Sequence, residues 1–170
     1  MRKSNLVLIG MPGAGKSTAG VLAAKALGMN FIDTDLLLQR QAKKLLQEII
    51  RQEGIAAFLA REEETILGLA VDNTVIATGG SVIYSPKSME HLRQNGFIVY
   101  LMLPFDELEV RIKNMSSRGI VMAAGQDLYS LYLERSPLYK AYADLVLDCS
   151  RQHIEETVAA ICAAAPARLR

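Results

Sequence analysis

The sequence predicts a three-layer α/β fold built on a parallel sheet. Short runs rich in β-branched residues alternate along the chain with longer stretches of helical periodicity. These runs are largely apolar without alternation, which is typical of strands that helices cover on both faces. With 170 residues, 51% of them hydrophobic, the chain can form one well-packed core and has little length left for a second. We therefore expect a single domain over residues 1–165 and a flexible tail at residues 166–170.

Each element can be assigned from its own pattern and boundaries. Pro104 stands near the first position of one expected helix, and Asp106 and Glu107 follow in its first turn, where acids complement the helix dipole. Residues 114–126 contain two serines and two glycines and are expected to form a mobile loop. Strands are predicted at residues 6–9, 30–32, 74–77, 97–101 and 145–147. Helices are predicted at residues 16–27, 35–51, 54–71, 85–95, 104–114, 127–141 and 152–164.

The charge balance excludes several classes of partner. Nineteen Lys and Arg residues against eighteen Asp and Glu give a formal net charge of +1, so no overall field would attract nucleic acid or an anionic membrane. The apolar run at residues 6–9 is too short for a secretion signal or a membrane span. Cys149 and Cys162 lack the spacing of metal ligands, and we expect both to be reduced, packed side chains. These features predict a cytoplasmic protein whose partners are small molecules.

A phosphate-binding loop is predicted between the first strand and the first helix. Residues 10–18, GMPGAGKST, fit the pattern G-x-x-x-x-G-K-[ST] in the strand and helix context that the pattern requires. Its glycines allow a close approach that a Cβ would obstruct, so successive N–H groups can converge on phosphate oxygens. A plain glycine-rich turn is the alternative, but all four fixed positions match. The predicted ATP-binding residues here are Gly13, Ala14, Gly15, Lys16, Ser17 and Thr18.

The side chains of this loop have distinct expected roles. Lys16 would reach the β- and γ-phosphates as a point charge, which makes it a predicted catalytic residue. The Ser17 hydroxyl stands where a Mg²⁺ ligand is expected, and Thr18 would support the α-phosphate. The sequence thus predicts a protein that binds ATP as co-substrate together with Mg²⁺.

Two further polar segments follow strands and should lie beside the loop, because the carboxyl ends of parallel strands face the ligand crevice. Asp33 and Asp35 stand at the end of the second strand, where one acid can serve the Mg²⁺ shell and the other can bind an acceptor hydroxyl. Both could instead merely cap the following helix. Gly79 and Gly80 follow the third strand, where their amides can approach a ligand or form a simple tight turn.

Together these motifs resemble the shikimate kinase family, among the nucleoside-monophosphate-kinase-like P-loop folds. The resemblance implies a P-loop kinase fold with five parallel strands in the order 2-3-1-4-5. It implies a substrate-binding helical segment near residues 34–61 and a lid near residues 113–125. The implied activity is transfer of the γ-phosphoryl group of ATP to the 3-hydroxyl group of shikimate. The motifs that carry the resemblance are the phosphate loop, Asp33-x-Asp35, Glu53-Gly54 with Phe58, Thr78-Gly79-Gly80, an arginine-bearing lid and the segment Glu134 to Tyr139.

The resemblance assigns a role to each matching residue on the nucleotide side. Asp33 matches the family's metal-shell acid, and Asp35 matches the acid that binds the substrate hydroxyl. Arg118 matches the lid arginine that closes on the phosphates, so Lys16, Asp35 and Arg118 form the implied catalytic set.

The adenine site is implied in the same way. Arg111 lies where the family has an arginine flanking the adenine. Residues 148–153 form the loop that encloses this base in the family, which gives His153 a neighbouring role.

The substrate carboxylate has one implied partner. Arg135 matches an arginine that holds this carboxylate, a group that its planar fork suits better than a lysine would. The alternative is a surface ion pair with Glu134 or Asp144. Gly79 and Gly80 complete the implied substrate site with Asp35 and Arg135.

Three positions depart from the family pattern. The family has an arginine that grips the carboxylate and, three residues later, a glutamate that orients it; here Leu59 replaces the arginine while Glu62 remains. Arg61 should face away from Leu59, because two residues along a helix correspond to about 200° of rotation. Ser81 replaces the third glycine of the family's Gly-Gly-Gly, and Gly119-Ile120 replaces Pro-Leu in the lid. Losing one arginine at a desolvated carboxylate costs on the order of 2–5 kcal/mol.

Three functions therefore have to be distinguished. The first is a shikimate kinase, and the second is a kinase of the same build for another small hydroxylated acid or polyol. The third is a nucleotide-dependent regulatory module without catalysis, which would need few of the acids and arginines named above. A kinase domain of this size can work alone, so a monomer is expected.

Overall fold

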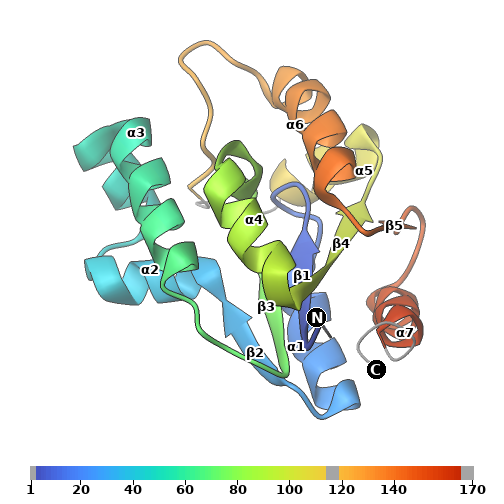
Figure 1. Ribbon diagram of the computed structural model, residues 1–170. Coiled ribbons are helices and arrows are strands. Elements are labelled where there is room, and N and C mark those ends of the chain that lie inside the picture. The colour runs from blue at the N-terminus through green and yellow to red at the C-terminus, as the bar shows by residue number, and fades with distance from the viewer. Residues whose placement is uncertain (1–2, 114–118, 166–170) are drawn as a thin grey trace.

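The computed structural model describes residues 3–113 and 119–165 and is built on a five-stranded parallel sheet (Figure 1). The strands lie in the order β2-β3-β1-β4-β5, and each neighbouring pair is parallel. The predicted α/β class, strand order and strand positions are thereby confirmed. The strands are β1 (Asn5–Ile9), β2 (Asn30–Asp33), β3 (Thr74–Ala77), β4 (Gly96–Met102) and β5 (Leu145–Asp148).

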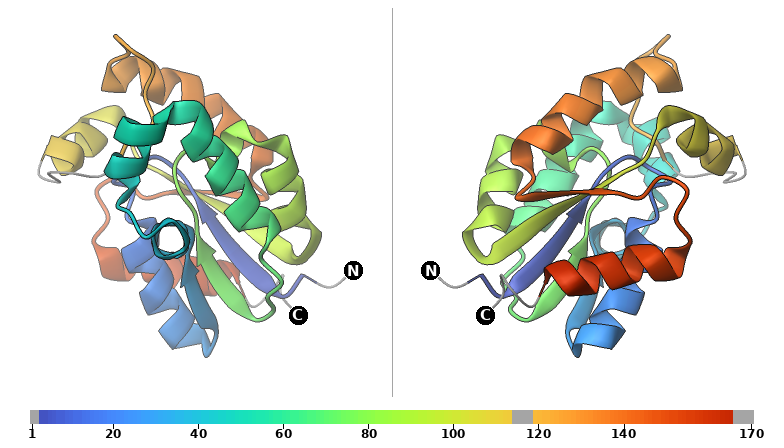
Figure 2. Two further views of the ribbon diagram at one scale, coloured as in Figure 1. Left: turned by 90° about the vertical axis from the view of Figure 1, so that its left-hand side faces the viewer. Right: turned by 90° about the vertical axis from the view of Figure 1, so that its right-hand side faces the viewer.

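Helices cover both faces of the sheet. Helices α1 and α7 pack side by side on one face, and α4 lies on the other with α3 packed against it (Figure 2). Within residues 3–113 and 119–165, no helix is long and apolar enough to cross a membrane. The helices are α1 (Lys16–Leu27), α2 (Thr34–Ala42), α3 (Leu46–Leu67), α4 (Pro86–Asn95), α5 (Phe105–Lys113), α6 (Leu128–Tyr142) and α7 (Ile154–Ala164), with a 3₁₀ turn η1 (Val82–Tyr84).

The segment after β2 contains one break that was not predicted. The expected helix over residues 35–51 is interrupted, because α2 ends where Lys43 adopts a left-handed conformation with φ of 52°. Helix α3 is interrupted at Gly54, whose φ of 87° and ψ of 169° are not helical, so the break expected between residues 51 and 54 is confirmed. Lysine is not a usual left-handed residue, so the sequence carried no signal for this end of α2.

The sheet brings its polar segments to one edge. The central strands β1 and β3 are buried at every position, whereas β5 alternates between half-buried and exposed residues. Because the strands are parallel, the phosphate loop after β1, Asp33 at the end of β2 and residues 78–81 after β3 meet at their carboxyl ends.

A second hydrophobic cluster lies apart from the main core. It joins Leu38 of α2, Ile49 and Phe58 of α3, and Val121. Val121 comes from the segment that leads into α6, so this segment is packed against α2 and α3.

Candidate active site

The loop between β1 and α1 has the backbone geometry of a phosphate cradle. Gly10, Gly13 and Gly15 have φ of 147°, 83° and 86°, a region that favours glycine. Gly15 is the N-cap of α1 and offers no side-chain acceptor, so the N–H groups of the first helical turn open toward the loop. A bound anion would meet these N–H groups at the positive end of the helix dipole.

Lys16 is held inside this loop. Its side chain is 7% exposed, and Nζ donates hydrogen bonds of 2.8 Å to the carbonyl oxygens of Gly10 and Met11. The ammonium group therefore already lies where the nucleotide phosphates are expected. Ser17 follows in the first turn of α1 and lines a cavity of about 360 Å³ whose polar wall includes Asp33 and Asp35.

The two acids after β2 have different environments. Asp33 caps α2, because its Oδ1 accepts hydrogen bonds from the backbone N–H groups of Asp35 at 3.0 Å and Leu36 at 3.2 Å. The alternative prediction that Asp33 caps the following helix is thus confirmed. Asp33 nevertheless stays on the wall of the cavity that Ser17 shares, so capping and metal binding are compatible.

The oxygen atoms around this cavity fit a magnesium ion. The Ser17 hydroxyl and the Asp33 carboxylate are both hard oxygen ligands on one cavity wall. Among the described residues there is no group of three or more His, Cys, Asp or Glu side chains that could hold a metal. Magnesium binds through one or two protein oxygens plus phosphates and water, so this sparse donor set suits it.

The end of α5 lies against the phosphate loop. A Cβ on Gly13 would be 3.1 Å from Cγ1 of Ile112, and a Cβ on Gly15 would be 3.9 Å from an Nη atom of Arg111. Glu107, one turn earlier on α5, pairs with Arg111 at 3.9 Å between Oε2 and Nη2. Arg111 is therefore beside the cradle, as its predicted contact with adenine requires.

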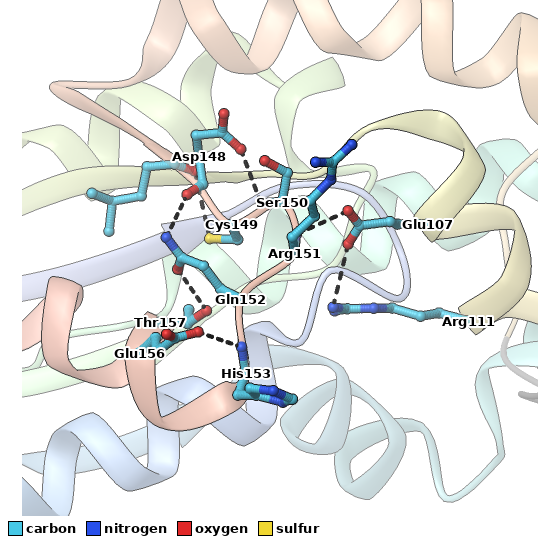
Figure 3. Close-up of polar contacts among 11 residues, drawn as sticks. Glu107, Arg111, Asp148, Cys149, Ser150, Arg151, Gln152, His153, Glu156 and Thr157 are labelled. Carbon is cyan, nitrogen blue, oxygen red and sulfur yellow. Dashed lines mark hydrogen bonds and ion pairs between the residues drawn. The ribbon is translucent and has the colours of Figure 1, made fainter.

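Glu107 also fixes the loop that follows β5. Figure 3 shows Glu107 between Arg111 and this loop, where its Oε1 accepts a 2.9 Å hydrogen bond from the backbone N–H of Arg151. His153 begins the next helix, α7, and its backbone N–H donates to Glu156 Oε2 at 2.8 Å. The exposed His153 ring adjoins the predicted adenine loop, and its contact with nucleotide stays a prediction.

The two cysteines match their expected character. Cys149 is a buried free thiol, and Cys162 is a half-buried free thiol. Burial raises the pKa of both thiols, so neither is activated as a nucleophile.

On the acceptor side, Gly79 separates two carboxyl groups. A Cβ on Gly79 would collide with Glu62 Oε1 and would lie 2.7 Å from Asp35 Oδ1. Ser81 Oγ donates a 2.7 Å hydrogen bond to the other oxygen of Glu62, Oε2. A side chain at position 79 would therefore displace at least one of these two carboxyl groups.

Arg135 is the buried cation of this region. It is 1% exposed, and a Cβ on Gly80 would lie 3.0 Å from its Nη1. Its Nη2 donates to the carbonyl oxygen of Val121 at 2.7 Å, and its Nε donates to the Tyr84 hydroxyl at 3.1 Å. The guanidinium also stacks over the Tyr84 ring at 5.1 Å.

The alternative of a surface ion pair for Arg135 is wrong. Asp144 pairs with Lys3 at 2.8 Å, and Glu134 accepts hydrogen bonds from Tyr84 and Gln126. Arg135 instead points into the interior of the acceptor side.

Neither Arg61 nor Lys44 takes the place of the family arginine that Leu59 replaces. Leu59 is half-buried and packs against the second hydrophobic cluster. Arg61 pairs with Glu53 at 2.8 Å, and Lys44 pairs with the same carboxylate at 2.9 Å. The expectation that Arg61 faces away from Leu59 is thereby confirmed.

The lid is described only in part. Arg118 lies outside the described residues. Directly after it, Gly119 contacts the start of α3, because a Cβ there would be 2.9 Å from the backbone nitrogen of Gln47. Val121 follows in the second hydrophobic cluster, so the described part of the lid rests on the acceptor side.

Comparison with known proteins identifies the family. The sequence model of shikimate kinase matches residues 12–165. The chain belongs to the shikimate kinase family. A shikimate kinase from Thiobacillus denitrificans is 36% identical over 156 residues, covering 90% of this chain and 85% of that protein. One from Nitrosomonas europaea is 38% identical over 151 residues, covering 87% of this chain and 72% of that protein.

Solved structures agree with this assignment. A shikimate kinase from Acinetobacter baumannii in complex with shikimate superposes with a TM-score of 0.86 at 30% identity, covering 94% of this chain and 90% of that one. Members of the shikimate kinase family are kinases, so this chain is a phosphotransferase with an alcohol group as acceptor.

Sequence reasoning missed three contacts of the site. Val121 and Tyr84 hold Arg135, and Glu107 joins Arg111 to the loop after β5. The three hydrogen bonds join segments that are distant in the sequence, so no local pattern marks them, whereas the Glu107–Arg111 pair has the local i, i+4 spacing of a helix.

Proposed function

We propose that this protein transfers the γ-phosphoryl group of ATP to the 3-hydroxyl group of shikimate. The observation that carries the proposal is the arrangement around Gly79-Gly80: a carboxyl oxygen of Asp35 lies close to Gly79, and the buried guanidinium of Arg135 lies close to Gly80. A hydroxylated carboxylic acid would meet a hydrogen-bond acceptor for its hydroxyl at one end and a cation for its carboxylate at the other.

Asp35 and Arg135 would orient the acceptor. The Asp35 carboxylate accepts a hydrogen bond from the acceptor hydroxyl and aligns it for in-line attack. The Arg135 guanidinium binds the substrate carboxylate, which takes the position of the Val121 carbonyl oxygen on Nη2. Substrate binding therefore requires the segment around Val121 to shift.

The phosphate side would supply charge stabilisation. Lys16 turns from the carbonyl oxygens of Gly10 and Met11 to the β- and γ-phosphates, where its charge offsets that of the transferring group. The resemblance to the family adds Arg118 from the lid. Closure of the lid excludes water, which would otherwise accept the phosphoryl group.

Ser17 and Asp33 would hold Mg²⁺. When bound, the ion would neutralise negative charge on the phosphates. Thr18 would support the α-phosphate, while Gly13, Ala14 and Gly15 would offer backbone N–H groups. Arg111 and His153 would border the adenine.

A different hydroxylated acid or a polyol is the second candidate acceptor. Leu59 favours it, because a half-buried leucine that packs against the second hydrophobic cluster stands where the family has an arginine. A less acidic acceptor would lose little affinity when leucine replaces arginine at position 59.

A coupled ADP-release assay separates these possibilities. Shikimate is run beside a panel of other hydroxy acids and polyols with ATP and Mg²⁺. We expect shikimate to give the highest kcat/KM. A higher value for another panel member would replace shikimate as the acceptor, and ATP binding without turnover on any acceptor would indicate a regulatory module.

We also propose a cellular location and an oligomeric state for the protein. The near-neutral charge and the two free thiols support a cytoplasmic location, and the size of the domain supports a monomer. Size-exclusion chromatography with light scattering tests the monomer, since a dimer mass would contradict it.

A further inference from the structure

Glu62 is a buried carboxyl group without a partner for one of its oxygens. The residue is 4% exposed, and Oε2 accepts the hydrogen bond from Ser81. Oε1 has no hydrogen-bond partner among the described residues and lies against Gly79, on the side that faces Asp35. An unpartnered oxygen at this depth is costly, so its position points to an interaction with a ligand or a proton.

The lost arginine explains this situation. Leu59 and Glu62 are three residues apart on α3 and share one helix face, so an arginine at position 59 would have stood beside Glu62. In this chain Glu62 has the Ser81 hydroxyl as its hydrogen-bond partner instead of an arginine. A hydroxyl group leaves the charge of the carboxylate uncompensated, whereas a guanidinium would cancel it.

The surroundings of Glu62 place the protonation change of its carboxyl group near neutral pH. Burial is the largest influence and raises the pKa of Glu62 to about 7, against the hydrogen bond from Ser81, which lowers it. The carboxylate of Asp35 on α2 raises it further, while Arg135 on α6 and Lys16 on α1 lower it. Geometry and charge thus agree that this group changes its protonation state within the working range of a cytoplasmic enzyme.

We propose that Glu62 is a specificity-determining residue whose protonation state sets the affinity for an acidic acceptor. As a neutral acid, Glu62 leaves the charge of Arg135 available to the acceptor carboxylate and offers a hydrogen-bond donor at Oε1. As a carboxylate, it adds a second negative charge beside Asp35 and opposes binding of an anion. This inference rests on the proposed function, because it takes the acceptor to be a carboxylic acid.

The pH dependence of the acceptor KM tests this inference. For shikimate and wild-type protein, we expect KM to rise roughly tenfold between pH 6 and pH 8.5, with the rise centred near pH 7. The KM for ATP, measured in the same reactions, serves as the internal reference. Shikimate methyl ester, which carries no charge, should show no comparable rise.

Three variants should change the pH dependence of the acceptor KM in ways that a purely structural role would not produce. One should abolish it, and the other two should move it in opposite directions. Glu62→Gln keeps the shape and removes the titration, so the acceptor KM should no longer depend on pH in this range. Ser81→Gly removes the hydrogen bond that lowers the pKa of Glu62, so the rise should move to higher pH. Leu59→Arg should move the rise to lower pH and reduce KM at pH 8.

The outcomes separate this inference from the proposed function. A wild-type acceptor KM that is flat from pH 6 to pH 8.5, or a rise that stays in place in Ser81→Gly, would overturn the role of Glu62 while leaving shikimate as the acceptor. Absence of shikimate phosphorylation at every pH would overturn the proposed function itself. Should Glu62→Gln not fold, the wild-type and Ser81→Gly profiles still decide the question.

Discussion

The phosphate side and the acceptor side of the candidate active site are built from different parts of the chain. The phosphate side consists of consecutive residues between β1 and α1, and the groups proposed to bind phosphate are mainly backbone N–H groups at the start of a helix. The acceptor side consists of side chains from separate elements, with the half-buried Asp35 from α2 and the buried Glu62 from α3 and Arg135 from α6.

This difference determines which substitutions can alter the chemistry of each side. A backbone cradle depends on local conformation, so substitutions elsewhere leave its chemistry unaltered. A pocket of buried charges depends on every neighbour, so Leu59 and Ser81 can change its charge balance without a change in fold.

Lys16→Ala should have the largest effect. It removes the charge that the loop holds over the phosphate site, and we expect kcat to fall by about 100- to 1000-fold. Steady-state kinetics at saturating ATP and acceptor measure this. Lys25→Ala, an exposed position on the same helix, is the matched control and should behave as wild type. A similar kcat for the wild type and Lys16→Ala would show that the loop contributes no charge stabilisation.

Arg135→Lys should act on the acceptor alone. Lysine keeps the charge and loses the planar fork, so we expect the acceptor KM to rise by about 100-fold with little change in the KM for ATP. Because Arg135 also holds Val121 and Tyr84, circular dichroism must first establish that the variant is folded. An equal rise of both KM values would contradict the separation of the two sides.

Glu62→Gln should change the pH dependence of stability. The pKa of Glu62 is raised to about 7 in the folded protein, above the ordinary value of 4.5 in the unfolded chain. The folded state therefore binds the extra proton, and its stability falls as pH rises from about 4.5 to about 7. Between pH 5 and pH 8, the free energy of unfolding of the variant should gain about 2–3 kcal/mol relative to wild type.

Urea unfolding at the two pH values measures this gain. Glu64→Gln, at an exposed position on the same helix, is the control and should show no such change. A difference between Glu62→Gln and wild type that is the same at both pH values would mean that Glu62 does not titrate in this interval.

Leu59→Arg should strengthen acceptor binding. An arginine at this position would approach Glu62 and the acceptor carboxylate, and we expect roughly tenfold tighter binding of shikimate at pH 7.5. Calorimetric titration with shikimate in the presence of ADP measures it. Leu59→Gln, which brings polarity without charge, should give little or no gain. Unchanged affinity in Leu59→Arg would show that position 59 does not face the acceptor.

Glu107→Ala should have the smallest effect. Its carboxylate links Arg111 to the loop after β5, so its loss should loosen the adenine site and raise the KM for ATP about threefold. The control is Glu109→Ala, which removes a more exposed acid from the same helix. An unchanged KM for ATP would show that the position of the loop after β5 does not depend on Glu107.

The same contrast explains what the sequence could predict. The sheet order was implied by the resemblance to the shikimate kinase family, whereas the cradle and the α/β class follow from consecutive residues, because local pattern determines them. The contacts of the acceptor side do not: Ser81 meets Glu62 across 19 positions, Arg135 meets Val121 across 14, and Arg151 meets Glu107 across 44. Such contacts depend on how helices pack, and a single sequence carries no direct record of packing.

The end of α2 was missed for a related reason. Lys43 takes a left-handed conformation in the turn between α2 and α3, and its neighbour Lys44 pairs with Glu53. Tertiary packing and this ion pair outweigh the local preference of lysine for a helical conformation.

The most direct test is to follow the phosphoryl group itself. Phosphorus NMR of wild-type protein with ATP, Mg²⁺ and shikimate should show ADP and a phosphate monoester appearing at equal rates, with the ester phosphorus coupled to the proton on carbon 3 of the ring. Unchanged ATP, or ADP accompanied only by inorganic phosphate, would contradict the account.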